Sequence, residues 1–212
     1  VYKMKRKEVK YLIFEKLTSF FSENGFKAYK AKEMFKKITP DGFFNVSIII
    51  LDYEPEFHVK FVLGIRINEI ENIYNQFSFV IDEGKNESET TLTSMDYFTG
   101  KEDDAYIVSS EDDLIVSLRN FQKLMLEKGF GYFQQFSSIQ ALDKEINQYP
   151  QKRNCHVKVE EDRASVGIIV AKLNQNPSYA ELVNIYRNSL SELHEDYQIK
   201  FEELVKYIEN YK

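Results

Sequence analysis

Residues 44–67, FNVSIIILDYEPEFHVKFVLGIRI, hold two apolar alternating runs on either side of a short polar segment. Alternation with a period of two is typical of strands that bury one face. Residues 53–56 between the runs, Tyr-Glu-Pro-Glu, indicate a turn. If Asp52 faces Phe57, the apolar side chains of both strands share one face of an antiparallel pair. This stretch therefore predicts the centre of an antiparallel sheet.

The segments before this pair extend the sheet and cover it. Apolar residues recur every three to four positions over residues 4–24, which predicts a helix, and Asn24-Gly25 ends it. Residues 26–30 and 33–38 read as short strands, followed by a Pro-Asp-Gly turn within residues 39–43. The apolar stripe of the helix is then expected to pack on the apolar face of the sheet.

The chain becomes helical after about residue 100. A short helix over residues 69–77, strands at 77–81, 90–95 and 106–109, and a polar loop at 82–89 come first. Ser110 and Ser138 then precede apolar stripes of helical period, and we expect the first of these helices to end at Lys128-Gly129. Further helices are expected at 166–173, from Asn176-Pro177 to residue 193, and around residues 201–208.

The fold class predicted is therefore α+β, with an N-terminal helix packed on an antiparallel β-meander and a mainly helical C-terminal half. We expect a helix-plus-sheet unit at residues 1–100 and a helical unit at 101–212, packed together as one compact protein.

The cysteine content and the length of the apolar runs indicate in which compartment the protein is found. Cys155 is the only cysteine, so no intramolecular disulfide can form, as is typical of a reducing compartment. The longest apolar run is of strand length, well below the roughly 18 residues that cross a bilayer. We therefore expect a cytoplasmic protein without membrane contact, although a leader removed ahead of Val1 stays an open alternative.

The charge is distributed unevenly along the chain. The net charge is −6, yet residues 1–60 hold 12 basic and 8 acidic residues. Residues 82–113 hold 11 acidic residues and 2 lysines. An acidic total argues against nucleic-acid binding, which needs a concentrated basic surface.

No motif indicates catalysis, a metal or a cofactor. Cys155 and His156 are adjacent, and neighbouring side chains of an extended segment point in opposite directions, so we expect no nucleophile–base pair. With three histidines and one cysteine in the chain, we expect no cluster of metal ligands. Gly129-Phe130-Gly131 lacks the further residues of a phosphate-binding loop.

Two surfaces are candidates for binding a partner. The polar face of the strand pair presents His58, Lys60 and Arg66. The preceding lysines could extend it, namely Lys27, Lys30, Lys32, Lys36 and Lys37. This face is either the ordinary outer face of a sheet or a surface for a partner or anion. The acidic region, with Asp103 and Asp104, is either a set of solvated loops or an electronegative surface for a basic protein partner.

Residues 5–77 also carry a resemblance. The pattern is an opening helix, Gly25-Phe26-Lys27, Phe35-Lys36-Lys37, Gly64-Ile65-Arg66, and a short helix with Glu71-Asn72-Ile73-Tyr74. It is similar to an uncharacterised bacterial domain-of-unknown-function group of small α+β proteins. The resemblance implies an immunity-like role, as for small acidic proteins that neutralise toxins, and it carries no catalytic residues.

These observations favour a non-enzymatic protein-interaction role, immunity-like in one form, with a basic protein as partner. Two alternatives stay open: a small-molecule or nucleotide-binding regulatory domain, and an enzyme with dispersed site residues. The sequence determines neither the identity of a partner nor the oligomeric state.

Overall fold

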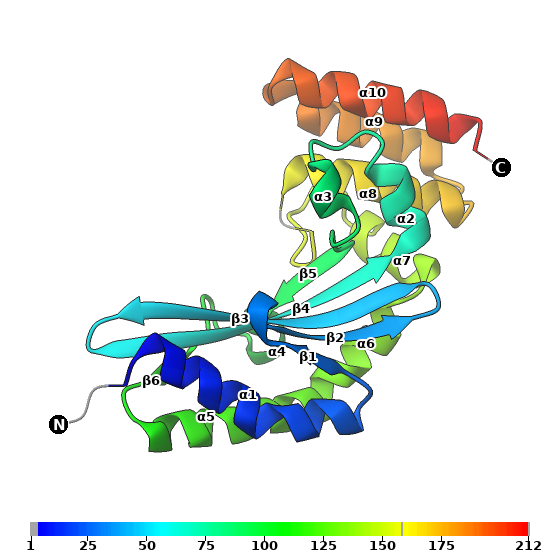
Figure 1. Ribbon diagram of the computed structural model, residues 1–212. Coiled ribbons are helices and arrows are strands. Elements are labelled where there is room, and N and C mark those ends of the chain that lie inside the picture. Colours follow the sequence, from blue (N-terminus) through cyan, green and yellow to red (C-terminus); the bar gives the residue numbers. More distant parts are fainter. Residues whose placement is uncertain (1–3, 158, 212) are drawn as a thin grey trace. The chain divides into compact units, whose positions relative to one another are not determined.

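A computed structural model describes residues 4–157 and 159–211 (Figure 1). It confirms the predicted α+β class: an N-terminal helix packs on an antiparallel sheet, and the C-terminal half is mainly helical. None of the helices within this described part is both long and apolar enough to cross a membrane.

The sheet is formed by six strands. Their bounds are β1 Lys27–Tyr29, β2 Met34–Thr39, β3 Gly42–Tyr53, β4 Glu56–Ile67, β5 Thr91–Ser94 and β6 Tyr106–Val108. The order in space is β1-β2-β3-β4-β5, and β6 also pairs with β4. Strands β2 and β3 pair antiparallel with Phe35 opposite Val46, and β4 and β6 pair antiparallel with Phe57 opposite Val108.

The long strands β3 and β4 follow the predicted alternation. Their bounds leave Glu54 and Pro55 as the connecting loop, as the predicted pairing requires. The pairing of Asp52 with Phe57 itself stays a prediction.

Helices take up most of the remaining chain. Their bounds are α1 Arg6–Glu23, α2 Asn68–Tyr74, α3 Asp82–Lys85, α4 Met95–Thr99, α5 Glu111–Leu124, α6 Phe130–Phe136, α7 Ile139–Asn147, α8 Glu160–Leu173, α9 Tyr179–Ser189 and α10 Glu195–Glu209. A π-helical turn, Met125–Gly129, joins α5 to α6, and 3₁₀ turns occupy Lys30–Lys32 and Leu190–Glu192.

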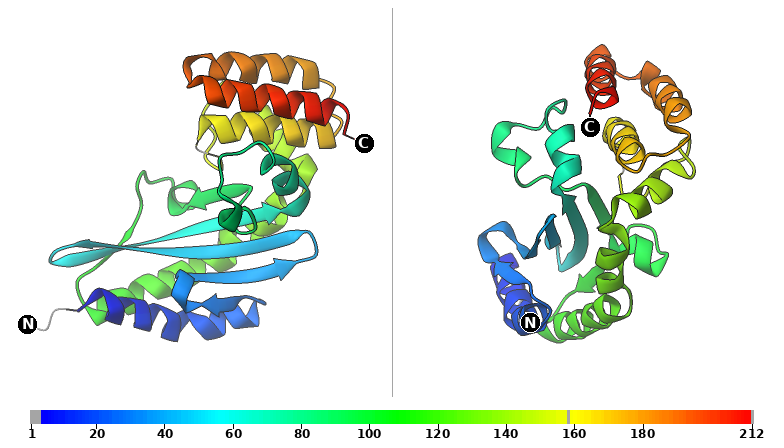
Figure 2. Two further views of the ribbon diagram at one scale, coloured as in Figure 1. Left: turned by 45° about the horizontal axis from the view of Figure 1, so that its top comes forward. Right: turned by 90° about the vertical axis from the view of Figure 1, so that its right-hand side faces the viewer.

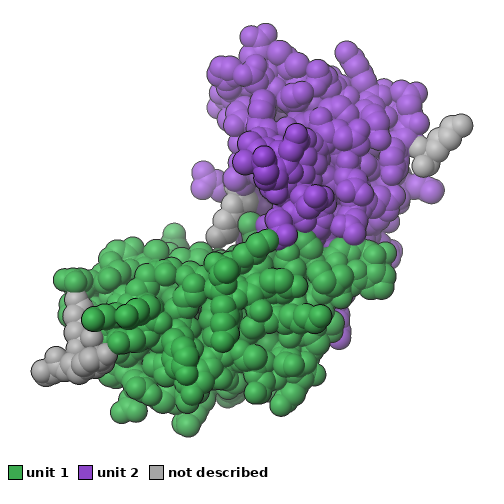
Figure 3. Space-filling model, in the orientation of Figure 1, with its two compact units in different colours: residues 1–65, 92–133 green, residues 66–91, 134–212 purple. Residues whose placement is uncertain are grey.

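The chain forms two compact units, coloured separately in Figure 3. Unit 1 comprises residues 1–65 and 92–133, and unit 2 comprises residues 66–91 and 134–212. Each unit is thus built from two separate stretches of sequence, whereas the expectation from the sequence was a single division near residue 100.

The core of unit 1 lies between the sheet and two helices. Figures 1 and 2 show α1 and α5 side by side across the same face of the sheet. The ring of Phe21 in α1 stacks on Phe35 of β2 at 4.3 Å, and Phe121 of α5 stacks on Phe61 of β4 at 3.6 Å. Such aromatic pairs add about 0.5–1.5 kcal/mol beyond the burial of their surface.

One predicted helix end in unit 1 is wrong. The helix was expected to end at Lys128-Gly129, but the chain passes through the π-helical turn directly into α6. Gly129 is buried, and a Cβ atom there would lie 2.4 Å from the sulfur of Met125. Gly129 therefore makes room for a neighbouring side chain and does not terminate a helix.

Unit 2 is built around α8, whose residues from Val166 to Ala171 are all buried. Helices α8, α9 and α10 lie side by side in both views (Figures 1 and 2). Beside them Asp143 of α7, only 3% exposed, accepts hydrogen bonds from three asparagine amides. The donors are Asn147, Asn174 and Asn176, at 2.7, 2.6 and 2.9 Å. This network satisfies the buried carboxylate and ties α7 to the loop after α8.

The strand predicted at residues 77–81 is also wrong. This segment follows α2 without regular structure. The hydroxyl of Ser78 bonds to the side chain of Asn75 and accepts from the backbone N–H of Val80, both at 3.3 Å. Such local side-chain bonds compete with the ladder of a sheet. The polar loop that follows contains the short helix α3.

Candidate functional site

A groove beside α10 is the strongest candidate site, and it can be derived from the sequence of that helix. Glu195, Gln198, Glu202 and Lys206 are separated by three or four positions, so they fall on one face of the helix. Another face of the helix carries the buried residues Leu204, Val205 and Ile208, and the buried Phe201 lies between the two faces. Helix α10 therefore presents one apolar face to the core of unit 2 and one charged face to the groove.

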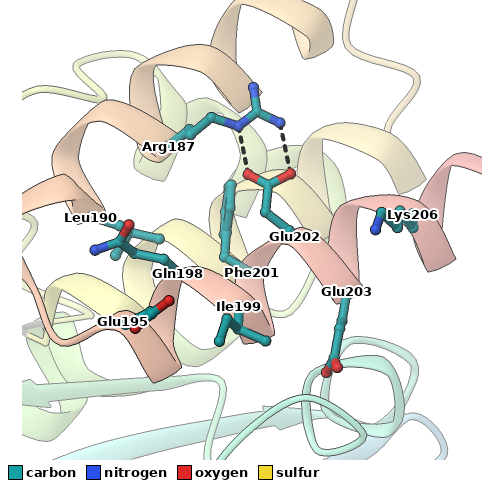
Figure 4. Close-up of a pocket in the computed structure, with 9 residues that line it drawn as sticks. All are labelled: Arg187, Leu190, Glu195, Gln198, Ile199, Phe201, Glu202, Glu203 and Lys206. Atoms are coloured by element: carbon teal, nitrogen blue, oxygen red, sulfur yellow. Dashed lines mark hydrogen bonds and ion pairs between the residues drawn. The ribbon is translucent and has the colours of Figure 1, made fainter.

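Helix α9 and the turn after it form the other wall of the groove. The volume is about 500 Å³, within the range of pockets that accept ligands. Leu190 and Phe201, exposed by 1% and 2%, also line it, and Ile199 is 48% exposed. Figure 4 shows these residues together with Arg187 of α9. An accessible isoleucine thus lies among charged side chains.

Two of the carboxylates in this groove, Glu202 and Glu203, have a basic partner. Arg187 donates to both carboxylate oxygens of Glu202, at 2.5 and 3.1 Å (Figure 4). The guanidinium holds the pKa of Glu202 below its usual range. Lys200 lies 3.1 Å from Glu203. A general acid or base needs a pKa near the working pH, so Glu202 is suited to binding and not to proton transfer.

The net charge of the chain is confined to the unit that holds this groove. Unit 1 contains 16 acidic and 16 basic residues, and unit 2 contains 18 acidic and 12 basic residues. Residues 181–209 alone contain seven acidic and three basic residues. The surroundings of the groove are therefore electronegative, which favours a basic ligand.

A second hollow in unit 2 has aromatic walls. It has a volume of about 230 Å³. The residues that line it come from α2, the segment after it, α8 and α10, and include Tyr74, Phe77, Phe79, Asp162 and Tyr197. The rings of Phe79 and Tyr197 meet edge to face at 5.1 Å. The volume is below the roughly 300 Å³ at which pockets for drug-sized ligands begin.

The polar centre of this hollow is a tyrosine–carboxylate pair. The hydroxyl of Tyr74 donates a short hydrogen bond to the carboxylate of Asp162. Burial raises the pKa of Asp162, and the hydrogen bond from Tyr74 opposes that change. Burial and the nearby Asp162 charge also raise the pKa of Tyr74. Perturbed groups of this kind in a hollow mark a candidate binding site.

The basic residues predicted as a partner surface are not brought together. Lys27 of β1, and Lys30 and Lys32 of the turn after it, are exposed. His58 and Lys60 lie on β4, which is separated from β1 by two strands, or about 14 Å. The predicted extension through Lys36 and Lys37 also fails. Lys36 is 7% exposed, and the amine of Lys37 donates to the carbonyl of Asn24 at 3.1 Å.

Arg66 does not lie on an exposed face. Its side chain is 5% exposed and donates to the carbonyl oxygens of Lys85 and Ser88, at 2.9 and 2.8 Å. It also faces the buried Glu71 at 3.9 Å. Arg66 lies on β4 as the alternation predicts, but its side chain is buried and links β4 to the segment of residues 85–88 within unit 2.

The two predicted surfaces partly neutralise each other within unit 1. Lys60 forms an ion pair with Asp103, and the backbone N–H of Asp103 donates to Asp96 at 3.1 Å. Asp104 is half-buried, and its charge adds to burial in raising the pKa of Tyr106 to about 12. His58 lies 3.1 Å from Glu56 and packs against the ring of Tyr53. These contacts fit an ordinary solvated surface.

Cys155 and His156 do not point apart as expected. Their segment is a bend and not an extended strand, so Sγ of Cys155 lies 3.5 Å from Nε2 of His156. A third potential ligand, Glu145 of α7, was not identified from the sequence. Glu145 is about ten residues from the other two ligands in the sequence, and this spacing does not match a known metal-binding motif.

The charged face of α10 was also missed, although its signal is present in the sequence. Residues 195, 198, 199, 202 and 206 keep helical spacing, beside the apolar stripe that predicts the helix itself. A scan against protein-family models and searches of curated proteins and solved structures found no significant match.

Proposed function

We propose that this protein acts by binding a basic segment of a partner protein in the groove between α9 and α10, without catalysing a reaction. The observation that carries the proposal is the exposed Ile199, which lies in this groove beside the carboxylates of Glu195 and Glu203. The groove belongs to unit 2, which has a net charge of −6, whereas unit 1 has a net charge of zero. This combination fits a partner segment with one apolar side chain flanked by lysine or arginine.

Each part of the groove has a separate role in this proposal. The apolar partner side chain buries Ile199, and each buried square ångström contributes about 25 cal/mol. The carboxylates attract the basic residues from a distance and set their register, which raises the association rate more than the final affinity. The Arg187–Glu202 pair stiffens the wall.

An immunity-like role is one form of this proposal. The resemblance of residues 5–77 to a group of small α+β proteins, some of them immunity-like, supports it. The single cysteine supports a reducing, cytoplasmic setting for such a role.

The test uses the full chain with an affinity tag and a labelled, lysine-rich amphipathic helical peptide as probe. Fluorescence anisotropy should show saturable binding that weakens steeply between low and physiological salt. The triple variant Glu195→Lys/Ile199→Asp/Glu203→Lys should lose at least about tenfold in affinity, equivalent to roughly 1.4 kcal/mol. A peptide of the same pattern with glutamate in place of lysine should not bind.

The matched control changes charge on unit 1. Lys27→Glu/Lys30→Glu should leave peptide binding unchanged. The same variants should be compared in capture experiments from the source cell, where the groove variant should lose a stoichiometric basic protein that the control retains. Equal binding by the wild type and the groove variant would contradict the proposal.

The hollow at Tyr74 supports a second candidate function, the binding of a small organic cation. An ammonium group can be held by the Asp162 carboxylate and by the faces of Phe79 and Tyr197. A thermal-shift screen of amines should show stabilisation that is lost in Phe79→Ala. The variant Leu126→Ala in unit 1, which removes a residue 65% exposed, is the control. No stabilisation by any amine would rule this candidate out.

A further inference from the structure

Three potential metal ligands of unit 2 converge on one point. They are Glu145 of α7 and the adjacent Cys155 and His156 in the bend before α8. Nε2 of His156 lies 3.5 Å from the sulfur of Cys155 and 3.6 Å from Oε1 of Glu145. All three ligand atoms lie within 4.8 Å of one another.

The geometry argues against a catalytic triad. In such a triad the nucleophile and the acid contact opposite nitrogens of the imidazole, so that the acid orients the ring while the other nitrogen takes the proton. Here both Cys155 and Glu145 approach Nε2 of His156. Convergence on a single nitrogen is what a shared cation requires.

The distances fit a tetrahedral zinc site. Zinc–sulfur and zinc–nitrogen bonds of about 2.3 and 2.05 Å at a tetrahedral angle place sulfur and nitrogen about 3.6 Å apart, and nitrogen and a carboxylate oxygen about 3.4 Å apart. The observed separations are 3.5 and 3.6 Å. Sulfur and the carboxylate oxygen lie within 4.8 Å of each other and must come to about 3.6 Å around one ion, so Glu145 moves toward Cys155 when the ion binds.

The bend that carries two of the ligands is held in place by other residues. The side-chain oxygen of Asn154 accepts from the backbone N–H groups of His156 and Val157, at 2.8 and 3.2 Å. Arg163, 3% exposed, donates to the carbonyls of Pro150 and Lys152, at 2.6 and 2.8 Å. These bonds arrange the ligands in advance, so binding an ion costs little further ordering.

We propose that Glu145, Cys155 and His156 form a binding site for a zinc-class divalent cation. Thiolate and imidazole ligands favour zinc or cobalt over calcium or magnesium, which prefer oxygen. Cys155 is exposed, and three protein ligands leave a fourth position for water or an external ligand. The thiol releases its proton when the ion binds. This site is independent of the α9–α10 groove.

The test uses the full chain without a histidine tag and Co²⁺ as a spectroscopic probe of the zinc site. Titration should give one equivalent of bound cobalt, with a thiolate charge-transfer band and the intense visible bands of tetrahedral cobalt, and Zn²⁺ should displace it. Cys155→Ser should abolish the charge-transfer band and weaken binding by more than about 100-fold, the upper range for loss of an outer-shell partner.

Two further variants keep the test decisive. Glu145→Gln should weaken cobalt binding while leaving the charge-transfer band of any bound cobalt in place. His58→Gln in unit 1 should change neither. Circular dichroism of each variant checks that the fold is retained, and since Cys155 is exposed, its serine variant should fold. Absence of saturable binding by the wild type, or unchanged affinity in Cys155→Ser, would overturn the proposal.

Discussion

Arg66 and Glu71 illustrate at the residue scale how a buried charge is tolerated. Both side chains are nearly inaccessible, at 5% and 1%. Burial raises the pKa of Glu71, and hydrogen bonds from Ser88 and Thr90 oppose that change. The guanidinium also donates to the carbonyl of Lys85 at the end of α3 and to the carbonyl of Ser88 in the loop that follows. Removing one partner of such a set leaves the others desolvated without compensation.

We therefore expect Arg66→Met to lower the free energy of unfolding by roughly 3–5 kcal/mol. The double variant Arg66→Met/Glu71→Leu should recover part of this loss, since it removes the uncompensated carboxylate as well. Lys27→Met, an exposed lysine of β1, should stay within about 0.5 kcal/mol of the wild type. Chemical denaturation measures all three, and a loss below about 1 kcal/mol for Arg66→Met would contradict this account.

Asp162 gives a prediction about pH. Because its pKa is raised from 3.8 in the folded protein, the folded state binds more protons than the unfolded state between the two pKa values. Stability contributed by this group is therefore lost as the pH rises through that window. Asp162→Asn keeps an acceptor for the Tyr74 hydroxyl and does not ionise.

Asp162→Asn should accordingly raise Tm at pH 7, and the difference from the wild type should shrink as the pH falls through the raised pKa of folded Asp162 toward 3.8, the pKa of the unfolded state. Thermal unfolding followed across pH 3 to pH 7 measures it. A variant less stable than the wild type at pH 7 would show that the Asp162 charge is stabilising, contrary to the burial argument.

At the scale of elements, helix α8 meets α9 at Gly167. A Cβ atom added there would lie 2.7 Å from the ring of Tyr186. Tyr186 is fully buried, and its hydroxyl donates to Asn147 at 2.7 Å, so the ring cannot move aside freely. Glycine is thus required here for close packing between helices and not for an unusual backbone.

Gly167→Ala should destabilise the protein by about 1–3 kcal/mol, the usual cost of overpacking a core. Gly131 of α6 is the matched control, since nothing lies within 4 Å of a Cβ atom built on it. Gly131→Ala should stabilise by roughly 0.5–1 kcal/mol, because alanine loses less backbone entropy in a helix. Differential scanning calorimetry measures the change in Tm. A lower Tm for Gly167→Ala together with a higher Tm for Gly131→Ala would support the packing argument, and equal changes in Tm would contradict it.

Element boundaries were predictable where a local side chain determines them. Gly25 ends α1 with a φ of +83°, and Ser138 caps α7 by accepting from the N–H of Ala141. Gly129 carries the same sequence signal as Gly25 but makes room for the side chain of Met125. Local sequence does not distinguish these two uses of glycine, so the continuation into α6 could not be predicted.

The candidate sites were predictable to a smaller extent. The charged face of α10 follows from the spacing of Glu195, Glu202 and Lys206, because a helix turns its own local sequence into a surface. Glu145 and His156 meet only because the bend before α8 folds back on α7, and no local rule specifies that contact. The predicted basic surface failed for a similar reason, since tertiary contacts bury Arg66.

At the scale of the whole molecule, each unit combines stretches that are distant in sequence. Phe121 of α5 packs on both Phe61 and Phe21 within unit 1. A fragment of residues 1–100 contains β1 to β5 but lacks both β6 and α5. Its apolar sheet face then has one of its two covering helices missing.

We expect the fragment 1–100 to form no cooperatively unfolding structure and to bind hydrophobic dyes, as a collapsed chain without specific packing does. Near-ultraviolet circular dichroism and a denaturant titration measure this. The full chain serves as the control, and a sharp unfolding transition of the fragment would show that α5 is dispensable for the core.

The placement of α5 has a consequence for the order of events during synthesis. The hairpin of β3 and β4 is complete at Ile67, yet Phe121 leaves the ribosome 54 residues later. At about 5–20 residues per second, this interval lasts roughly 3–11 seconds. Over that time the nascent hairpin has α1 alone to shield its apolar face. The newly made chain therefore passes through a window in which chaperones, or other hairpins, compete with α5 for the same surface.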